Sequence, residues 1–333
     1  MPQKALVTGA SGFTGYYLVQ NLIAHDYDVR ALVRSTSKID KLRQLPVTIF
    51  FGDIRSEREV EMAMEDADIV FHIAALYRAA NVPDAEYWAV NAHGTENVLK
   101  AALKKGVKRL VHCSTAGVYG HVENPPGDEN SPFNPGDVYQ ESKLEGEKIA
   151  FFYYREKSLP VTVVRPTGIY GPGDFRMLKM YRMIQNGKFI IFGSGNVFYH
   201  LTYVKDTVEG FRLAGENPQA VGKAYIIAGD EYITLNQFTQ TIAKELSVPA
   251  PSVHLPVLPL YITAFIVEKL CVPLRIQPPI FRRRLDIFTK DRAFDCSKAK
   301  RELGYRPKVG YVEGIHKTVK WYITEGLLKK IKD

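Results

Sequence analysis

Short apolar runs alternate with amphipathic runs along the first half of the chain. Continuously apolar segments of strand length stand at 4–8, 28–34, 47–54, 67–75, 107–115 and 160–167. Segments with the 3.6-residue apolar repeat of helices lie between them, at 12–24, 56–66, 90–106 and 140–158. Apolar strands separated by helices are typical of a parallel sheet that is covered on both faces. The pattern therefore predicts an α/β fold with a doubly wound parallel sheet of the Rossmann type.

This alternation loosens after Pro166. Proline and glycine concentrate in three segments, at 165–174, 192–196 and 256–260. Helical repeats stand at 175–185, 204–214, 235–245 and 297–303. We interpret residues 1–170 as a dinucleotide-binding domain to which some later segments return. Residues 171–333 are expected to form mainly a smaller, mostly helical substrate-binding portion.

One apolar segment, residues 258–272, needs a separate interpretation. It is broken by Pro259, is followed by Pro273, and carries Glu268 and Lys269. It is therefore too short and too charged to cross a bilayer. A core helix or a lid helix is the favoured interpretation. An interfacial membrane helix is the alternative, because basic residues follow the segment.

The net charge of +8 is concentrated near the carboxyl end. From residue 269 onward, about 17 Lys and Arg stand against about 7 Asp and Glu. Such a segment suits a phosphorylated substrate or a membrane surface, with peripheral contact through 255–284, or it is simply a solvated basic face. Nucleic acid is the least favoured partner, because no nucleic-acid-binding motif accompanies the charge.

The cysteine content bears on the compartment. Cys113, Cys271 and Cys296 have no metal-type spacing and cannot all pair. This usage favours a reducing compartment. The first residues also lack a charged and then apolar leader, so we expect a cytoplasmic location.

A glycine-rich turn joins the first predicted strand to the first predicted helix. Gly9, Gly12 and Gly15 form a G-x-x-G-x-x-G pattern in "TGASGFTG", with Phe13 and Thr14 inside it. Glycine allows a tight turn and lets a pyrophosphate approach the backbone, and the helix N-terminus then offers free N–H groups. The turn predicts a dinucleotide-binding site, although a strand-to-helix turn can need glycine for its conformation alone.

The second and third predicted strands carry the residues expected around the adenosine. The second strand ends at Arg34 with no acidic residue at its tip, and a guanidinium there suits the 2′-phosphate of NADP. NADP is thus favoured over NAD, unless Arg34 only stacks on adenine. Asp53, next to Ile54, is placed to accept a hydrogen bond from the adenine amino group, or it caps the following helix.

The pentapeptide "YQESK" places Tyr139 and Lys143 on one face of a predicted helix. Taken with its context it resembles a family, the extended short-chain dehydrogenase/reductases. The resemblance covers most of the chain and is carried by the order and spacing of several motifs. These are "TGASGFTG", "GDI", "HIAA" at 72–75, "VNAHGTENVL" at 90–99, "HCSTAGVYG" at 112–120, "RPTGIYGPGD" at 165–174, "LTYVKD" at 201–206 and "DCSKAKRELGYRP" at 295–307.

The resemblance implies roles for individual residues. Tyr139 would be the acid–base, and Lys143 would bind the nicotinamide ribose and lower the pKa of the phenol. Thr115 would hold the substrate oxygen, with Ser114 as a cofactor contact or as the substitute. Asn91 would organise the site or cap a helix. The remaining implied cofactor contacts are Ala74, Ala75, Pro166 and Thr167.

The family contains several reaction types. Ala116 and Gly117 stand where its dehydratases carry an Asp–Glu pair, which argues against a dehydratase. Tyr199 stands where sugar-nucleotide epimerases usually have an arginine, although Arg284 in the triplet Arg282–Arg284 could bind phosphate instead. The motifs resemble 3β-hydroxysteroid and sterol-carboxylate dehydrogenases and dihydroflavonol-type reductases more closely.

We therefore expect reversible hydride transfer at a secondary alcohol or ketone of a bulky small molecule. A nucleotide-sugar 4-epimerase is the alternative, and a non-catalytic NADP(H) sensor is a minor one. Tyr77, Thr115, Tyr199 and Arg284 are the candidate substrate contacts. No metal site is expected, and His72, His112 and His200 lack metal spacing. The resemblance also implies a homodimer formed through the helix of Tyr139 and the helix at 92–105.

Overall fold

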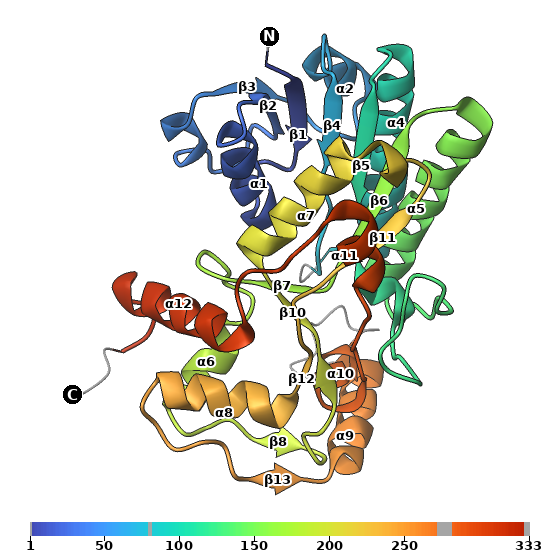
Figure 1. Ribbon diagram of the computed structural model, residues 1–333. Helices are drawn as coiled ribbons and strands as arrows, with labels where there is room; N and C mark the ends of the chain where they lie inside the picture. The colour runs from blue at the N-terminus through green and yellow to red at the C-terminus, as the bar shows by residue number, and fades with distance from the viewer. Residues whose placement is uncertain (1, 79–81, 272–281, 330–333) are drawn as a thin grey trace.

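A seven-stranded parallel sheet organises the first part of the molecule (Figure 1). The structure is a computed structural model that describes residues 2–78, 82–271 and 282–329, with only the backbone of 282–284. The strand order is β11-β6-β5-β4-β1-β2-β3, and each neighbouring pair is parallel. The strands are β1 (Lys4–Thr8), β2 (Asp28–Val33), β3 (Val47–Phe51), β4 (Ile69–His72), β5 (Arg109–Cys113), β6 (Val161–Pro166) and β11 (Ala224–Ile227).

Helices cover both faces of this sheet. On one face lie α1 (Phe13–Ile23), α7 (Val204–Glu216) and α11 (Ser297–Leu303), whose buried side chains share one apolar cluster with β1 and β2. On the other lie α2 (Glu57–Ala63), α4 (Gly94–Lys104) and α5 (Val138–Lys157), which share a second cluster. Both faces are apolar because both are buried, which is the reason the strands show continuous apolar runs.

The predicted doubly wound α/β fold is confirmed, with all six predicted strands and the four helices between them present. The helix predicted at 90–106 begins as a π-helical segment, Ala89–His93, which continues directly from α3 (Asp84–Trp88). The seventh strand, β11, was not predicted individually. It brings a segment from the second half of the chain to the edge of the sheet beside β6.

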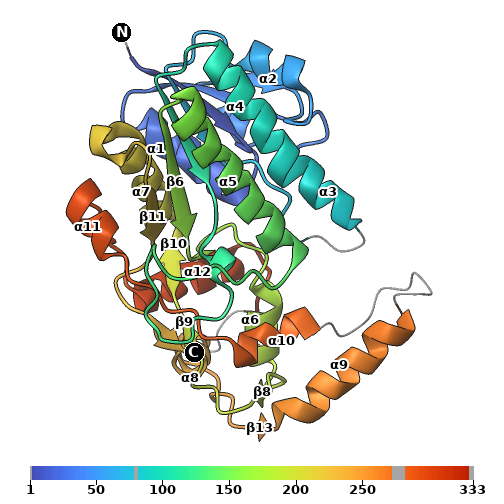
Figure 2. The same cartoon turned by 90° about the vertical axis from the view of Figure 1, so that its right-hand side faces the viewer.

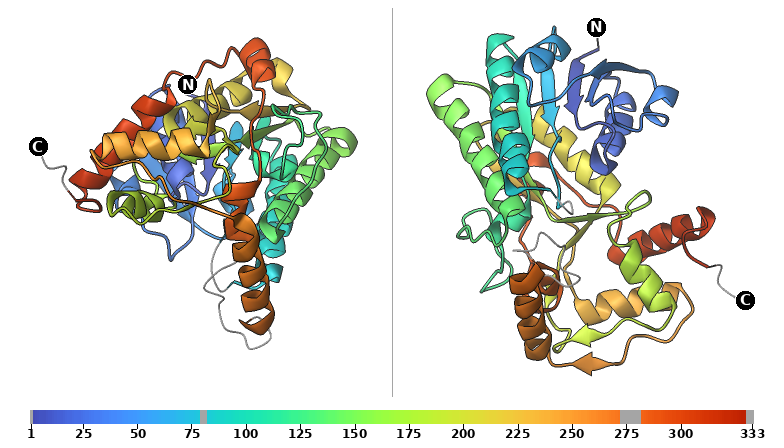
Figure 3. Two further views of the ribbon diagram at one scale, coloured as in Figure 1. Left: turned by 90° about the horizontal axis from the view of Figure 1, so that it is seen from below. Right: turned by 180° about the vertical axis from the view of Figure 1, so that it is seen from behind.

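The remaining elements form a second region beyond the carboxyl ends of the strands (Figures 1 and 3). Three two-stranded ladders pair β10 with β7, β12 with β9, and β13 with β8. These short strands are β7 (Gly168–Tyr170), β8 (Ile191–Phe192), β9 (Phe198–Tyr199), β10 (Leu201–Tyr203), β12 (Ile233–Thr234) and β13 (His254–Leu255). The helices are α6 (Leu178–Gln185), α8 (Leu235–Glu245), α9 (Val257–Cys271), α10 (Arg282–Thr289) and α12 (Tyr311–Thr324).

The helix α9 differs from the core helix that was one of its two favoured interpretations. Its large apolar side chains are exposed, Leu258 by 65% and Leu270 by 63%, and only Ala264 is buried. It therefore is not a core helix, and none of its residues lines the main cavity described below. Figure 2 shows it at the edge of the molecule, away from the sheet. Within the described residues, every helix is too short or too polar to cross a bilayer.

A buried ion pair fixes α5 against the sheet. Nε of Arg165 on β6 lies 3.1 Å from Oε2 of Glu147 on α5, and both side chains are almost fully buried. The guanidinium also contacts the hydroxyl of Tyr119 and donates to the carbonyl of Glu129 at 3.1 Å. This buried ion pair therefore fixes the position of α5, which carries Tyr139, relative to β6, which ends at Pro166.

Candidate active site

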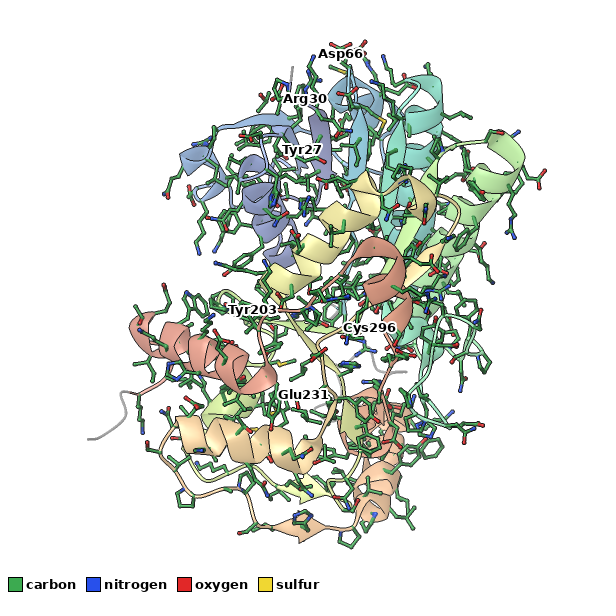
Figure 4. All side chains as sticks on the ribbon, in the orientation of Figure 1. Tyr27, Arg30, Asp66, Tyr203, Glu231 and Cys296 are labelled. Carbon is green, nitrogen blue, oxygen red and sulfur yellow. The ribbon has the colours of Figure 1, made fainter. Side chains whose placement is uncertain are left out.

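The predicted site residues meet in one cavity of about 650 Å³ at the carboxyl ends of the sheet strands. This is the position at which open α/β sheets bind ligands. Figure 4 shows Arg30 and Asp66 at the opposite, amino end of the strands. The lining contains every cofactor residue expected from the sequence, namely Gly9, Gly12, Phe13, Thr14, Gly15, Arg34, Asp53, Ile54, Ala74, Ala75, Ser114, Tyr139, Lys143, Pro166 and Thr167.

The glycine-rich turn leaves no room for side chains. Gly9 has φ +72°, and a Cβ there would lie 2.7 Å from the backbone nitrogen of Ala74. A Cβ on Gly15 would lie 2.2 Å from the carbonyl oxygen of Gly9. The turn packs directly against the segment that follows β4, and the N-terminus of α1, which begins at Phe13, lies at the cavity. These features fit a bound pyrophosphate.

The candidate adenosine contacts follow the neighbouring strands β2 and β3. Arg34 follows β2 and lines the cavity with Ser37. The carboxylate of Asp53 accepts from Nε of Arg55 at 3.1 Å and from its Nη2 at 2.8 Å, and this contact holds the pKa of Asp53 below its usual range. Asp53 is not a helix cap, because Ser56 caps α2.

The first turns of α5 place Tyr139 and Lys143 in the cavity. Asp137 caps the helix by accepting from the N–H of Gln140 at 2.9 Å. The ring of Tyr139 meets that of Tyr77 edge-on, with centroids 5.0 Å apart. Nζ of Lys143 is buried and has no hydrogen-bond partner among the described residues. A buried ammonium without a partner fits a ribose hydroxyl that would accept from it.

Burial is the main cause of the pKa shifts of Tyr139 and Lys143. It raises the pKa of Tyr139 well above its ordinary value, with smaller contributions from Tyr77 and Cys113, and it lowers the pKa of Lys143. The cations that oppose the rise in the pKa of Tyr139 are Arg78 and Arg176. Without cofactor, desolvation of a buried phenolate outweighs the nearby positive charge. The expectation that Lys143 lowers the pKa of the phenol applies to the site that also holds the positively charged nicotinamide ring, and it stays a prediction.

Two hydroxyl groups follow β5 at the cavity wall. The hydroxyl of Thr115 accepts from the N–H of Gly117 at 3.0 Å. The hydroxyl of Ser114 is buried and has no partner among the described residues. Both residues line the cavity, so either hydroxyl can donate to a ligand there.

Asn91 connects the cavity wall to α5. Its amide oxygen accepts from the N–H of Leu76 at 2.8 Å, and its amide nitrogen donates to the carbonyl of Leu76 at 3.1 Å. The same nitrogen donates to the hydroxyl of Ser142 at 3.0 Å. Asn91 therefore is not a helix cap but orders the segment beside Tyr77. It lies in the π-helical turn, a local structure that is frequent at functional sites.

The histidines near the site have structural partners or lie in the core. His72 bonds Thr8 at 2.8 Å and Thr95 at 3.0 Å, and burial lowers its pKa to about 3. His112 is fully buried beside it. His200 lines the cavity and bonds the carbonyl of Gly229 at 3.0 Å. Among the described residues, no group of three or more His, Cys, Asp or Glu is placed to hold a metal ion.

The candidate substrate contacts divide into three that lie in the cavity and one that cannot be placed. Tyr77, Thr115 and Tyr199 line the cavity, whereas the side chain of Arg284 lies outside the described part of the chain. Arg78, Arg176 and Arg292 also line it and were not predicted. Arg78 and Arg292 stand in segments without regular apolar repeats, and Arg176 stands at the start of the helix predicted at 175–185. Only the adjacency of Arg78 to Tyr77 could have pointed to one of them.

This fold and this cavity define a nucleotide-binding enzyme of the Rossmann type. The family model of the NAD dependent epimerase/dehydratase family matches residues 5–228. The chain belongs to that family, the extended short-chain dehydrogenase/reductases, and is an NAD(P)-dependent enzyme of it.

Relatives of known activity represent both reactions expected from the sequence. The 3beta-hydroxysteroid-dehydrogenase/decarboxylase isoform 1 of Arabidopsis thaliana is 32% identical, over 94% of this chain and 78% of its own. The N-acetyl-alpha-D-glucosaminyl-diphospho-ditrans,octacis-undecaprenol 4-epimerase of Escherichia coli O157:H7 is 32% identical, over 77% and 76%. The structure of UDP-glucose 4-epimerase from Thermotoga maritima with UDP-glucose has a TM-score of 0.79 at 26% identity, covering 97% of this chain and 99% of that one.

Proposed function

We propose that the protein is a dehydrogenase or reductase that interconverts a secondary alcohol and a ketone on a bulky, largely apolar small molecule. The observation that carries this proposal is the composition of the substrate side of the cavity. Apolar and aromatic side chains form much of its wall, beside the arginines Arg78, Arg176 and Arg292, and such a wall suits a bulky apolar ring system better than a sugar. The apolar and aromatic side chains are Tyr77, Ile169, Met177, Tyr199, Leu201 and Phe294.

The chain's own groups account for the proton chemistry. A nicotinamide dinucleotide bound between the glycine-rich turn and Lys143 would supply the hydride acceptor or donor. Thr115 or Ser114 orients the substrate oxygen, and Tyr139 removes the hydroxyl proton during oxidation or returns it during reduction. Lys143 would hold the nicotinamide ribose through its buried ammonium, which has no partner among the described residues. The apolar wall excludes water from the reacting carbon.

The test compares one substrate of the steroid dehydrogenases with one substrate of the sugar-nucleotide epimerases. Purified protein is given NAD or NADP with a 3β-hydroxysteroid, and separately UDP-galactose, and both formation of reduced cofactor and epimerisation are followed. Reduced cofactor with the steroid alone supports the proposal. Epimerised sugar, or NAD(H) retained tightly through purification, would favour the 4-epimerase, which regenerates its cofactor in place. Binding of cofactor with neither reaction would favour a sensor.

The cofactor preference we propose is for NADP. Arg34 and Ser37 line the adenosine end, and the Asp53 carboxylate is already engaged by Arg55. A guanidinium at the end of β2 suits a 2′-phosphate. NADPH should therefore bind more tightly than NADH, and Arg34→Ala should remove most of this difference. Equal affinities in the unchanged protein would contradict the preference.

Two assembly properties also belong to the proposal. We propose a homodimer through α4 and α5, supported by Leu103 and Phe152, whose side chains are exposed on these helices. We also propose peripheral membrane contact through α9, supported by its exposed apolar side chains. Such a contact would bring the protein to a lipid-like substrate. It is compatible with a cytoplasmic protein that binds a membrane surface reversibly.

A further inference from the structure

The guanidinium of Arg176 contacts two aromatic rings of the cavity wall. Its Cζ lies 5.3 Å from the ring centroid of Phe13 and 5.4 Å from that of Tyr77, and all three residues line the cavity. Phe13 opens α1 at the glycine-rich turn, and Tyr77 lies in the segment that follows β4. A cation is attracted to the face of an aromatic ring. Arg176 therefore ties the glycine-rich turn to the segment beside Tyr139.

Polar contacts hold this guanidinium in place. Its Nε donates to Oδ1 of Asp174 at 2.7 Å, and its Nη2 donates to Oδ2 at 3.1 Å and to the carbonyl of Ile169 at 2.6 Å. The side chain of Asp174 is 2% exposed and is not among the described residues that line the cavity, whereas that of Arg176 is 39% exposed. The cation thus reaches the cavity wall, and its carboxylate partner stands behind it.

The segment that carries Arg176 is anchored to both regions of the molecule. The hydroxyl of Tyr17 on α1 donates to the carbonyl of Pro172 at 2.9 Å. The hydroxyl of Tyr322 on α12 donates to the carbonyl of Asp174. Because α1 covers the sheet and α12 belongs to the second region, the packing of the two regions sets the place of Arg176.

Tyr77 links Arg176 to Tyr139. The ring of Tyr77 lies under the guanidinium and meets the ring of Tyr139 edge-on, with centroids 5.0 Å apart. The guanidinium therefore lies within about 10 Å of the Tyr139 ring, a distance over which unit charges interact appreciably in a partly buried site.

Other charged and titratable groups also surround Tyr139. They are Tyr77 and Arg78 on the segment after β4, Cys113 on β5, Asp137 at the cap of α5 and Lys143 on that helix. Cζ of Arg78 lies 5.8 Å from the Tyr139 ring centroid, and its Nη2 lies 2.7 Å from Asp137. Burial raises the pKa of Tyr139, and both Arg78 and Arg176 oppose that rise. A test of Arg176 has to leave these other groups unchanged.

We infer that Arg176 is a positioning residue of the reaction, which holds the ring of Tyr77 edge-on against Tyr139 and places a fixed positive charge beside that ring. This inference rests on the proposed function, because it takes Tyr139 as the acid–base. A fixed cation favours the phenolate over the phenol, and the phenolate is the form that accepts the proton of an alcohol. Cofactor and substrate in the cavity would exclude water from Arg176 and strengthen its effect.

Two substitutions on one ion pair test the inference in opposite directions. Arg176→Gln removes the cation, and Asp174→Asn leaves it without its carboxylate. Tyrosine labelled with carbon-13 at Cζ reports the ionisation of each phenol in the NADP-loaded protein, and Tyr139→Phe identifies the signal of Tyr139. The pKa of Tyr139 should rise in Arg176→Gln and fall in Asp174→Asn, each by about one unit or less, the effect of a unit charge at roughly 10 Å in a partly buried site.

Further variants separate the charge from folding. Arg176→Lys keeps the charge and should keep most of the unchanged pKa. The double variant Asp174→Asn with Arg176→Gln should still raise the pKa, and it leaves no buried carboxylate unpaired, so it serves if Arg176→Gln alone does not fold. Arg182→Gln is the control, because Arg182 lies exposed on α6 outside the cavity lining and binds the carbonyl of Leu327. It should leave the titration unchanged.

Steady-state rates show whether the effect reaches the reaction. At neutral pH, kcat/KM for alcohol oxidation should fall by up to about tenfold in Arg176→Gln, because the phenolate fraction falls. It should not fall in Asp174→Asn, whereas structural damage would lower it in both variants.

The titration and the rates distinguish this inference from the proposed function. Opposite shifts of the Tyr139 signal without oxidation of any alcohol leave the inference standing, and the proposed function fails. A Tyr139 signal that titrates alike in the unchanged protein and both single variants, that shifts in one direction in both variants, or that does not titrate below about pH 10 in any of them overturns the inference. If an alcohol is then still oxidised, the proposed function stands without it.

Discussion

At the residue scale, the environment of Tyr139 sets the pH behaviour of the proposed reaction. Burial raises the pKa of its phenol, whereas Arg78 and Arg176 oppose that rise. The deprotonated phenol is the base for alcohol oxidation, so kcat/KM for oxidation should increase with pH through the neutral and alkaline range. Ketone reduction needs the protonated phenol and should show no such increase. Steady-state rates in both directions across pH check this.

The same residue gives a direct test of catalysis. Tyr139→Phe keeps the ring against Tyr77 but removes the only proton-exchanging atom of the side chain. Turnover should fall by about 10²- to 10⁴-fold, the usual contribution of general acid–base catalysis. Cofactor affinity, measured by fluorescence titration, should change little. Unchanged turnover would exclude Tyr139 as the acid–base.

Asn91 acts through the segment it holds. Its side chain satisfies both backbone groups of Leu76 and contacts Ser142 on α5. Asn91→Ala should cost about 1–3 kcal/mol in the free energy of unfolding, because it leaves buried polar groups unpaired. It should also lower kcat, since Tyr77 and Arg78 follow Leu76 directly. Chemical denaturation and steady-state kinetics measure the two effects, and stability loss with unchanged kcat would limit Asn91 to a structural role.

At the element scale, the buried pair of Arg165 and Glu147 joins α5 to β6. Glu147→Ala should destabilise the protein by roughly 3–5 kcal/mol, because it leaves a buried guanidinium without its counter-ion. Glu145→Ala is a control on the same helix. Its pair with Lys148 is exposed and should contribute at most about 1 kcal/mol. Similar losses in the two variants, measured in urea, would contradict this account.

The helix α9 provides a second prediction at this scale. Ile262 is 49% exposed on it, so Ile262→Glu should leave the melting temperature nearly unchanged. The same change should weaken sedimentation with anionic lipid vesicles, because a charge opposes insertion of the apolar face. Met62→Glu on α2 is the matched control, since Met62 is exposed outside α9. Equal vesicle binding by all three proteins would remove the membrane contact.

At the scale of the whole molecule, the cavity lies between the sheet and the second region. The homodimer that we propose would form through two outer helices, α4 and α5. The proposed dimer buries α4 and α5 against their copies. Light scattering should therefore give twice the chain mass of 37.6 kDa. The double variant Leu103→Glu with Phe152→Glu should give a monomer, because it places charges in an apolar contact. A monomeric unchanged protein would refute the dimer.

The sequence by itself determined the sheet of the first half. Its strands are buried on both faces, so their apolar runs are continuous and their helices keep a regular repeat, as at α1 and α5. It also pointed to the glycine-rich turn through the local spacing of its glycines. It pointed to Tyr139 and Lys143 only through the resemblance carried by the order of the motifs around them.

Only the tertiary structure decided the rest. The edge position of β11 depends on pairing with β6, and the exposure of α9 depends on what packs against it; neither is a local property. The contacts of Arg176 with Phe13 and Tyr77 join segments that lie far apart in the chain. The raised pKa of Tyr139 comes mainly from burial, and spacing along the chain does not measure burial.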